Sequence, residues 1–245
     1  MPRPYVRKLS AYEQEPVAWS IEGFAGGQTR PLSADPETGA ATELLELPPG
    51  WRAPPGRFRA AIELLVVDGG LAIGEYRLGR FSYSYLPAGV TAGPWSAADG
   101  ARVLWMPAGR QAFDAGRDSV PDAQRERWIP QIDSSALPWQ PTITPGFPVG
   151  AMRKTLRVDP DTGAGTWLLG MLPQVRDTRR EVHPTAEEGF TLLGESHSER
   201  GVSRAGEYFW RPPFIPHGPF HTDVGVLTFF RTDGPLRTDY SWPDP

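Results

Sequence analysis

Two stretches of this chain occur twice. Residues 35–42, Asp-Pro-Glu-Thr-Gly-Ala-Ala-Thr, return at 159–166 as Asp-Pro-Asp-Thr-Gly-Ala-Gly-Thr, and a Leu-Leu pair follows shortly after each copy. Residues 83–96 align in the same way with residues 208–221. The first offset is 124 residues and the second is 125. Self-similarity of this kind indicates a tandem duplication. We therefore predict two similar domains, one over residues 1–125 and one over residues 126–245.

The composition of both halves is typical of β structure. The chain has 28 Pro and 27 Gly among 245 residues, and short β-branched or aromatic runs lie between turn signals such as Asp-Pro-x-Thr-Gly. Segments with a helical period are scarce. Pro and Gly favour turns, whereas β-branched and aromatic residues favour strands. We therefore predict an all-β chain that folds into two tandem β-barrels.

Charge and composition argue against several classes of partner. The formal net charge is −4 and the pI is near 5.6, which argues against a nucleic-acid surface. No run approaches eighteen apolar residues and the first residues carry no apolar segment, so we expect neither a membrane span nor a secretory signal. The chain has no Cys, which excludes disulfides, thiolate ligands and a Cys nucleophile. These features together favour a cytoplasmic protein.

The four histidines lie in the last quarter of the chain, at His183, His197, His217 and His221. Neutral imidazole is the commonest protein ligand of transition metals. Two of them have other motif-type residues at defined spacings. Glu187 comes four positions after His183 and Gly194 seven positions after Glu187, and His217 comes five positions after Pro212. His197 lies in a polar turn, where we expect it to be solvated. The spacing points to a metal site in the second half.

This spacing resembles the two motifs of the cupin superfamily, His-x-His-x(3,4)-Glu-x(6)-Gly and Gly-x(5)-Pro-x-Gly-x(2)-His. Three positions depart from the motifs: Glu181 stands at the first His, Phe214 at a Gly, and His221 at the usual Asn. The chain is most similar to the ChrR-like group and related bicupins. The resemblance implies two jelly-roll barrels and a donor set of His183, Glu187, His217 and His221.

Local sequence leaves two of these assignments open. The prolines and glycine of 211–221 forbid a helix, and in an extended strand His217 and His221 share a face unless a bulge at Gly218-Pro219 turns one away. His221 is then either a fourth ligand or a base that faces the substrate. Either Glu187 or Glu188 could be the carboxylate ligand of the motif, and the six residues that separate Glu from Gly in the motif favour Glu187.

The first repeat serves as an internal control. The repeat offsets carry His183 back to Arg59, Glu187 to Glu63, His217 to Ala92, and His221 to Ser96. An arginine offers no lone pair to a metal. We therefore predict that the N-terminal barrel is degenerate and metal-free, with Arg57 or Arg59 in the vacated space as the ion-pair partner of Glu63.

For the second barrel we predict one divalent metal per chain, with Fe(II) favoured and Mn, Ni or Zn as alternatives. The resemblance implies a non-haem Fe(II) dioxygenase that acts on a small oxygenated or aromatic metabolite, in a pocket flanked by Tyr208, Trp210 and Phe220. One alternative is a non-redox isomerase or lyase in which Glu181 or His221 carries the proton. Another is a small-molecule sensor of the ChrR-like type. A monomer and a homodimer are both compatible with the duplication.

Overall fold

A computed structural model describes residues 3–141 and 146–242 of the chain. Within these ranges the regular structure is almost entirely β, and the helical elements are two short 3-10 turns, η1 (Ala11–Glu13) and η2 (Arg125–Arg127). No helix of this part of the chain is long and apolar enough to cross a membrane. The prediction of an all-β chain is confirmed.

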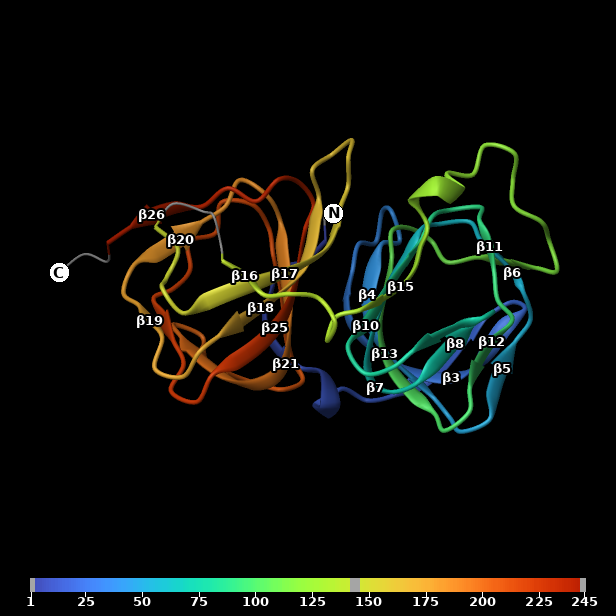
Figure 1. Cartoon of the computed structure of the whole chain (residues 1–245), viewed down its shortest axis with the longest axis horizontal. Helices are drawn as coiled ribbons and strands as arrows, with labels where there is room; N and C mark the ends of the chain where they lie inside the picture. Colours follow the sequence, from blue (N-terminus) through green and yellow to red (C-terminus); the bar gives the residue numbers. More distant parts are fainter. Residues whose placement is uncertain (1–2, 142–145, 243–245) are drawn as a thin grey trace. The chain divides into compact units, whose positions relative to one another are not determined.

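The chain forms two compact units, each a jelly-roll β-barrel (Figure 1). The first is built mainly from Tyr12–Ala136, and the second from Tyr5–Ala11 together with the chain from Leu137 onward. The first unit continues past residue 125 because β15 (Ile129–Asp133) pairs with β10 (Ser82–Leu86) of the same barrel. Near the N-terminus, β1 (Val6–Ser10) pairs with β23 (Glu207–Arg211) and so belongs to the second barrel.

The first barrel contains three antiparallel sheets. The largest has the strand order β15, β10, β7 (Ile62–Gly69), β13 (Ala101–Pro107), β4 (Ala41–Leu47), β3 (Phe24–Ala34) and β2 (Val17–Ile21). The second has the order β5 (Trp51–Ala53), β12 (Trp95–Ala97), β8 (Leu71–Ile73) and β9 (Tyr76–Leu78). The third has the order β11 (Thr91–Ala92), β6 (Gly56–Phe58) and β14 (Phe113–Ala115).

The second barrel repeats this plan around one large sheet. Its main path is β1, β23, β21 (Glu187–Ser198), β25 (Val226–Thr232), β18 (Gly165–Met171), β17 (Ala151–Val158) and β16 (Gln140–Pro141). Three short strands extend it: β22 (Gly201–Arg204) and β24 (Phe220–His221) pair with β21, and β19 (Arg176–Asp177) pairs with β24. A separate pair joins β20 (Arg180–Val182) to β26 (Asp239–Ser241).

Aromatic side chains fill the interior of the first barrel. Phe24 lies at the centre, with its ring centroid no more than 5.4 Å from those of Trp19, Trp51, Phe58, Trp95 and Phe113. Most of these pairs meet edge to face, which is a favoured geometry for aromatic rings. All six side chains are buried. This interior is therefore a packed apolar core.

The two barrels have the same strand register apart from one inserted residue. Equivalent residues of the two copies are 124 positions apart early in the repeat and 125 positions apart later in it. Arg52 and its partner Ser96 correspond to Arg176 and its partner His221, at offsets of 124 and 125. Gly56 and its partner Ala92 correspond to Glu181 and His217, both at an offset of 125. The extra residue of the second copy lies within residues 178–180, which replace Pro54-Pro55 of the first copy. From Gly56 onward, each residue of the first barrel therefore corresponds to the one 125 positions later.

Candidate metal centre

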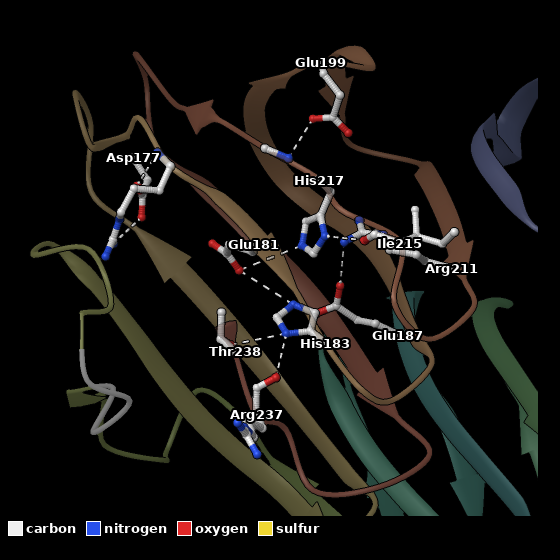
Figure 2. A network of polar contacts seen from close by, with 12 residues as sticks. Asp177, Glu181, His183, Glu187, Glu199, Arg211, Ile215, His217, Arg237 and Thr238 are labelled. Atoms are coloured by element: carbon white, nitrogen blue, oxygen red, sulfur yellow. Dashed lines mark hydrogen bonds and ion pairs between the residues drawn. The ribbon is translucent and has the colours of Figure 1, made fainter. Parts of the chain in front are cut away.

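Three buried side chains converge inside the second barrel, from Glu181 in β20, from His183 just after it, and from His217 (Figure 2). Glu181 and His217 form an isolated antiparallel bridge and exchange two backbone hydrogen bonds of 2.8 and 2.9 Å. His183 follows Glu181 by two positions, and residues two apart in an extended chain point to the same face. The Phe214 amide donates to the His183 carbonyl at 2.8 Å and fixes this edge of the site.

The three side chains face one another without hydrogen-bonding. Nε2 of His183 lies 3.7 Å, and Nε2 of His217 3.8 Å, from Oε2 of Glu181, beyond hydrogen-bond length. Oε1 of Glu181 is buried and has no hydrogen-bond partner among residues 3–141 and 146–242. A buried polar atom without a partner is costly unless something else satisfies it. The arrangement thus leaves three donor atoms aimed at a common space.

Backbone carbonyls set the tautomer of both imidazoles. Nδ1 of His183 lies 3.0 Å from the carbonyl oxygen of Arg237, and Nδ1 of His217 lies 3.2 Å from that of Ile215. A carbonyl oxygen only accepts hydrogen bonds, so Nδ1 must carry the proton in each ring. In the neutral imidazole, Nε2 then keeps its lone pair and directs it toward Glu181. Metal-binding histidines are commonly oriented in this way.

Burial favours the uncharged forms of these groups. It raises the pKa of Glu181 to about 8, with the nearby carboxylates of Glu187 and Asp177 acting in the same direction. It also lowers the pKa of His217 to about 2, and the positive charge of Arg211 adds to this effect. Neutral imidazole is the form that binds a metal, and an adjacent cation favours the ionised carboxylate.

These residues fit a divalent metal ion. Two imidazoles and one carboxylate form a donor set that first-row metals accept. Donors bound at about 2.1 Å each lie no more than ~4.2 Å apart, and the separations of 3.7 and 3.8 Å fall within that limit. His183 and His217 lie side by side, with ring centroids 5.0 Å apart, and the carboxylate that groups with them is Glu181, the residue that stands in place of the first motif His.

Glu187 lies beside these three residues but has a different partner. Its Oε1 is 3.8 Å from Nε2 of His183, and its Oε2 is 3.2 Å from Nη1 of the buried Arg211. Glu188 points to the other face, where it accepts a hydrogen bond of 2.8 Å from the Tyr208 hydroxyl and pairs with Arg231. The alternation of strand β21 thus places Glu187, and not Glu188, next to the candidate site.

His221 does not join the site, contrary to the expected donor set. It lies opposite His197 in the β21–β24 pairing, with ring centroids 4.6 Å apart, and Asp223 is close to both. Its neighbour Phe220 faces the cavity instead. The chain from His217 to His221 is not one continuous strand, because Gly218 has a φ of +85° and β24 begins only at Phe220. The expected alternation is therefore broken, and His221 is not among the residues that line the cavity.

The first barrel has apolar residues where the second has its donors. With the observed register, Glu181 corresponds to Gly56, His183 to Phe58, Glu187 to Ile62, Arg211 to Leu86 and His217 to Ala92. The predicted pairing of Glu63 with Arg57 or Arg59 is wrong, because both arginines pair with Asp114. Glu63 instead accepts a hydrogen bond of 2.7 Å from Tyr83, as Glu188 does from Tyr208.

A cavity of about 110 Å³ opens beside the candidate donors. Phe220 and Tyr208 line it as the sequence predicts, whereas Trp210 is not among its lining residues. Sequence reasoning missed three arginines that also line it, Arg153, Arg200 and Arg211. No motif marked them, since they lie on three separate parts of the barrel.

Comparisons with known proteins agree with this fold. Residues 11–239 match the model of one family, described as a domain of unknown function, DUF4437. No curated protein matches the sequence. Among solved structures, a protein of Nostoc punctiforme PCC 73102 named "putative dioxygenase" is 31% identical, with a TM-score of 0.89 over 100% of this chain and 87% of that one.

More distant structures share the architecture alone. Oxalate decarboxylases of Bacillus subtilis and Lactobacillus farciminis are 11% and 12% identical, with TM-scores of 0.62 and 0.63. Each alignment covers 95% of this chain, and it covers 77% and 87% of the two relatives respectively. The expected cupin-type jelly-roll fold is confirmed.

Proposed function

This chain belongs to the DUF4437 family, and from that premise we propose that it is a non-haem Fe(II) dioxygenase for a small oxygenated metabolite. The observation that carries the proposal is the buried group of Glu181, His183 and His217. Two histidines and one carboxylate with open positions are characteristic of non-haem Fe(II) oxygenases. The similar Nostoc protein, which is named as a dioxygenase, adds support.

Each residue of the site has a distinct part in this proposal. Glu181, His183 and His217 would hold one metal ion per chain, and the carbonyls of Arg237 and Ile215 keep the two imidazoles in the binding tautomer. Bound Fe(II) would supply a centre at which O2 and the oxygen atoms of a substrate meet. With His221 outside the cavity, Glu187 is the carboxyl group left beside the site for proton transfer.

The walls of the cavity suit such chemistry. Phe147, Trp167, Phe220 and Phe230 line it and keep bulk water away from the donors. An enclosed apolar wall protects reactive oxygen species from side reactions. The absence of cysteine argues against the thiolate sets that commonly close structural zinc sites.

The test is anaerobic reconstitution with Fe(II), followed by a screen of small oxygenated acids for O2 uptake and product. We expect turnover that requires both Fe(II) and O2 and that is lost in His183→Ala. A substrate that is converted equally well under nitrogen, or with Zn(II), would replace the oxygenase by the non-redox isomerase or lyase. Ligand binding without turnover under any of these conditions would favour the sensor module.

Several broader assignments belong to the same proposal. We propose that the chain is a bicupin of the ChrR-like group whose first barrel holds no metal, because apolar residues occupy the equivalent positions there. We also propose a cytoplasmic protein that acts on small molecules as a monomer or homodimer, with no nucleic-acid or membrane partner. The acidic pI of 5.6 supports the absence of a nucleic-acid partner.

A further inference from the structure

Three arginine side chains at the cavity of the second barrel have N–H groups that no acceptor of the described residues satisfies by a hydrogen bond. Nε of Arg153, Nε of Arg200, and Nε and Nη1 of Arg211 are buried and hydrogen-bond no group of the described protein. All three residues line the cavity that also contains Glu181, His183 and His217. Arg200 also donates from Nη1 to the Arg7 carbonyl at 3.4 Å and has an ion pair with Glu199 at 3.6 Å. Each buried N–H group that still makes no hydrogen bond is nevertheless costly. These N–H groups therefore indicate a ligand that accepts hydrogen bonds.

Arg200 and Arg211 pack against the same aromatic ring, and burial together with the charge of Arg211 lowers the pKa of Arg200. The guanidinium carbon of each is 4.6 Å from the centre of the same Phe209 ring. Their side chains are only 11% and 3% exposed, so water screens their mutual repulsion weakly. Arg211 has an ion pair with Glu187 at 3.2 Å, although its geometry is not that of a hydrogen bond. Two neighbouring buried cations are stabilised by an anion between them or beside them.

The charges that line the cavity leave a positive excess. Five cationic side chains, Arg7, Lys8, Arg153, Arg200 and Arg211, line the cavity with three carboxylates, Glu181, Glu187 and Glu207. A fourth carboxylate, Glu199, pairs with Arg200 from outside the lining, which still leaves one positive charge in excess. A divalent ion held by the three donors would add two further positive charges. A neutral or cationic substrate would leave that excess unbalanced, whereas an anion would reduce it.

The remaining wall indicates an organic anion. Leu169, Met171, Val226 and Phe230 offer apolar surface to carbon atoms, and the Arg153 guanidinium is stacked 4.5 Å from the Trp167 ring centre. The volume of about 110 Å³ limits the ligand to a small molecule, because a larger cavity of ~150 Å³ binds benzene. The planar fork of a guanidinium matches the two oxygens of a carboxylate.

We infer that the second barrel binds a small carboxylate anion, which Arg153, Arg200 and Arg211 recognise next to the candidate metal donors. This inference rests on the proposed function in one respect, that the metal-bearing cavity is also the substrate site. The carboxylate would lie against the arginines, and the carbon skeleton against the apolar wall.

Calorimetric titration with lactate and with lactamide tests the inference, because the two probes have nearly the same shape and differ in charge. Both chelator-treated and Zn(II)-loaded protein are titrated, so binding is measured without turnover. We expect lactate to bind at least ~10-fold more tightly than lactamide, since hydrogen bonds to charged groups contribute that much or more. Inorganic phosphate serves as a third probe, and we expect it to bind more weakly than lactate.

Variants assign the binding to the arginines. Arg153→Gln and Arg200→Gln should each weaken lactate binding by ~10-fold or more. Arg204→Gln is the matched control, because this residue is on β22, is 67% exposed and does not line the cavity, so binding should stay within about twofold. Thermal unfolding establishes whether each variant is folded. If a Gln variant does not fold, Arg153→Lys or Arg200→Lys is used in its place. The Lys variant should also bind lactate more weakly, because lysine lacks the planar fork of arginine.

The outcomes separate this inference from the proposed function. Lactate binding that depends on the arginines supports the inference even if no metal binds and no O2 is consumed. Equal affinity for lactamide, tighter binding of phosphate, or unchanged binding in both arginine variants overturns it, even if Fe(II) supports turnover.

Discussion

Phe58 occupies in the first barrel the backbone position that His183 occupies in the second. Gly56 pairs with Ala92 as Glu181 pairs with His217, and Phe58 and His183 each follow two residues later. Both side chains are buried, at 0% and 4% exposure. One copy of the duplicated barrel thus has an aromatic ring in its core where the other has an imidazole beside a carboxylate. The first copy gains apolar packing, and the second keeps a buried carboxyl oxygen, Oε1 of Glu181, that hydrogen-bonds no group of the described residues.

This relationship predicts unequal effects on stability. Phe58→Ala should lower the free energy of unfolding by about 3–5 kcal/mol, because it removes a fully buried ring that packs on Phe24, Trp95 and Trp105. His183→Ala in chelator-treated protein should cost much less, since the imidazole lines the cavity and faces the carboxyl groups of Glu181 and Glu187. Urea unfolding of the two variants provides the measurement. Equal losses would contradict the assignment of these two positions.

Metal occupancy should depend on the buried group and not on the surface histidines. Protein purified without chelators should contain about one metal per chain, and a His183→Ala, His217→Ala double variant should lose most of it, because changes around metal ligands alone can cost 10–100-fold in affinity. His197→Ala with His221→Ala is the matched control, since these two rings stack on each other away from the cavity. Elemental analysis is the readout. Loss of metal in the control, with retention in the first variant, would reverse the assignment.

Glu181 and Glu187 should respond differently to neutralisation. Glu181→Gln removes a donor and should weaken metal binding strongly. Glu187→Gln leaves the buried Arg211 without its ion-pair partner, which should destabilise the fold by about 3–5 kcal/mol and weaken metal binding less. Metal titration and urea unfolding of both variants separate these effects. A larger loss of metal affinity in Glu187→Gln would make Glu187 the carboxylate ligand, as the motif count predicts.

The fold could be predicted from sequence because the repeat and the β-type composition can be recognised without knowing which residues pair between strands. The equivalence of the two sites could not. The two matching segments, 35–42 and 83–96, flank the inserted residue of the second copy without locating it. A shift of one residue moves every side chain of a strand to the other face. Because of that shift, the sequence predicts Arg59 and Glu63 as the equivalents of His183 and Glu187, whereas the structure places Phe58 and Ile62 there.

The site was predictable only where motif spacing coincides with strand geometry. His183 and His217 follow the spacing and do meet. His221 does not, because the positive φ of Gly218 interrupts the strand, and sequence alone gives no such angle. The sequence predicts Glu181 or His221 as a proton carrier in the non-redox alternative, whereas the place of Glu181 opposite His217 depends on a backbone bridge between distant segments. The three arginines of the cavity come together only in the folded barrel.

The metal-free protein should lose stability at alkaline pH because of Glu181. Burial raises the pKa of this carboxyl from 4.5 to about 8 in the folded state, so between these values the folded chain holds a proton that the unfolded chain has released. The stabilisation is complete below pH 4.5 and is lost as the pH rises through 8. His217 stays neutral over this range, because its pKa is lowered to about 2.

Between pH 6.5 and 9, this group should cost chelator-treated protein about 2 kcal/mol of unfolding free energy. Glu181→Gln cannot titrate, so its stability should fall less over the same interval, and the difference between the two proteins isolates the carboxyl. Urea unfolding at both pH values gives that difference. Wild-type protein loaded with Zn(II) should also lose less, because a bound cation keeps the carboxylate ionised at both pH values. Parallel pH profiles for chelator-treated wild type and Glu181→Gln would show that Glu181 is already ionised in the metal-free fold.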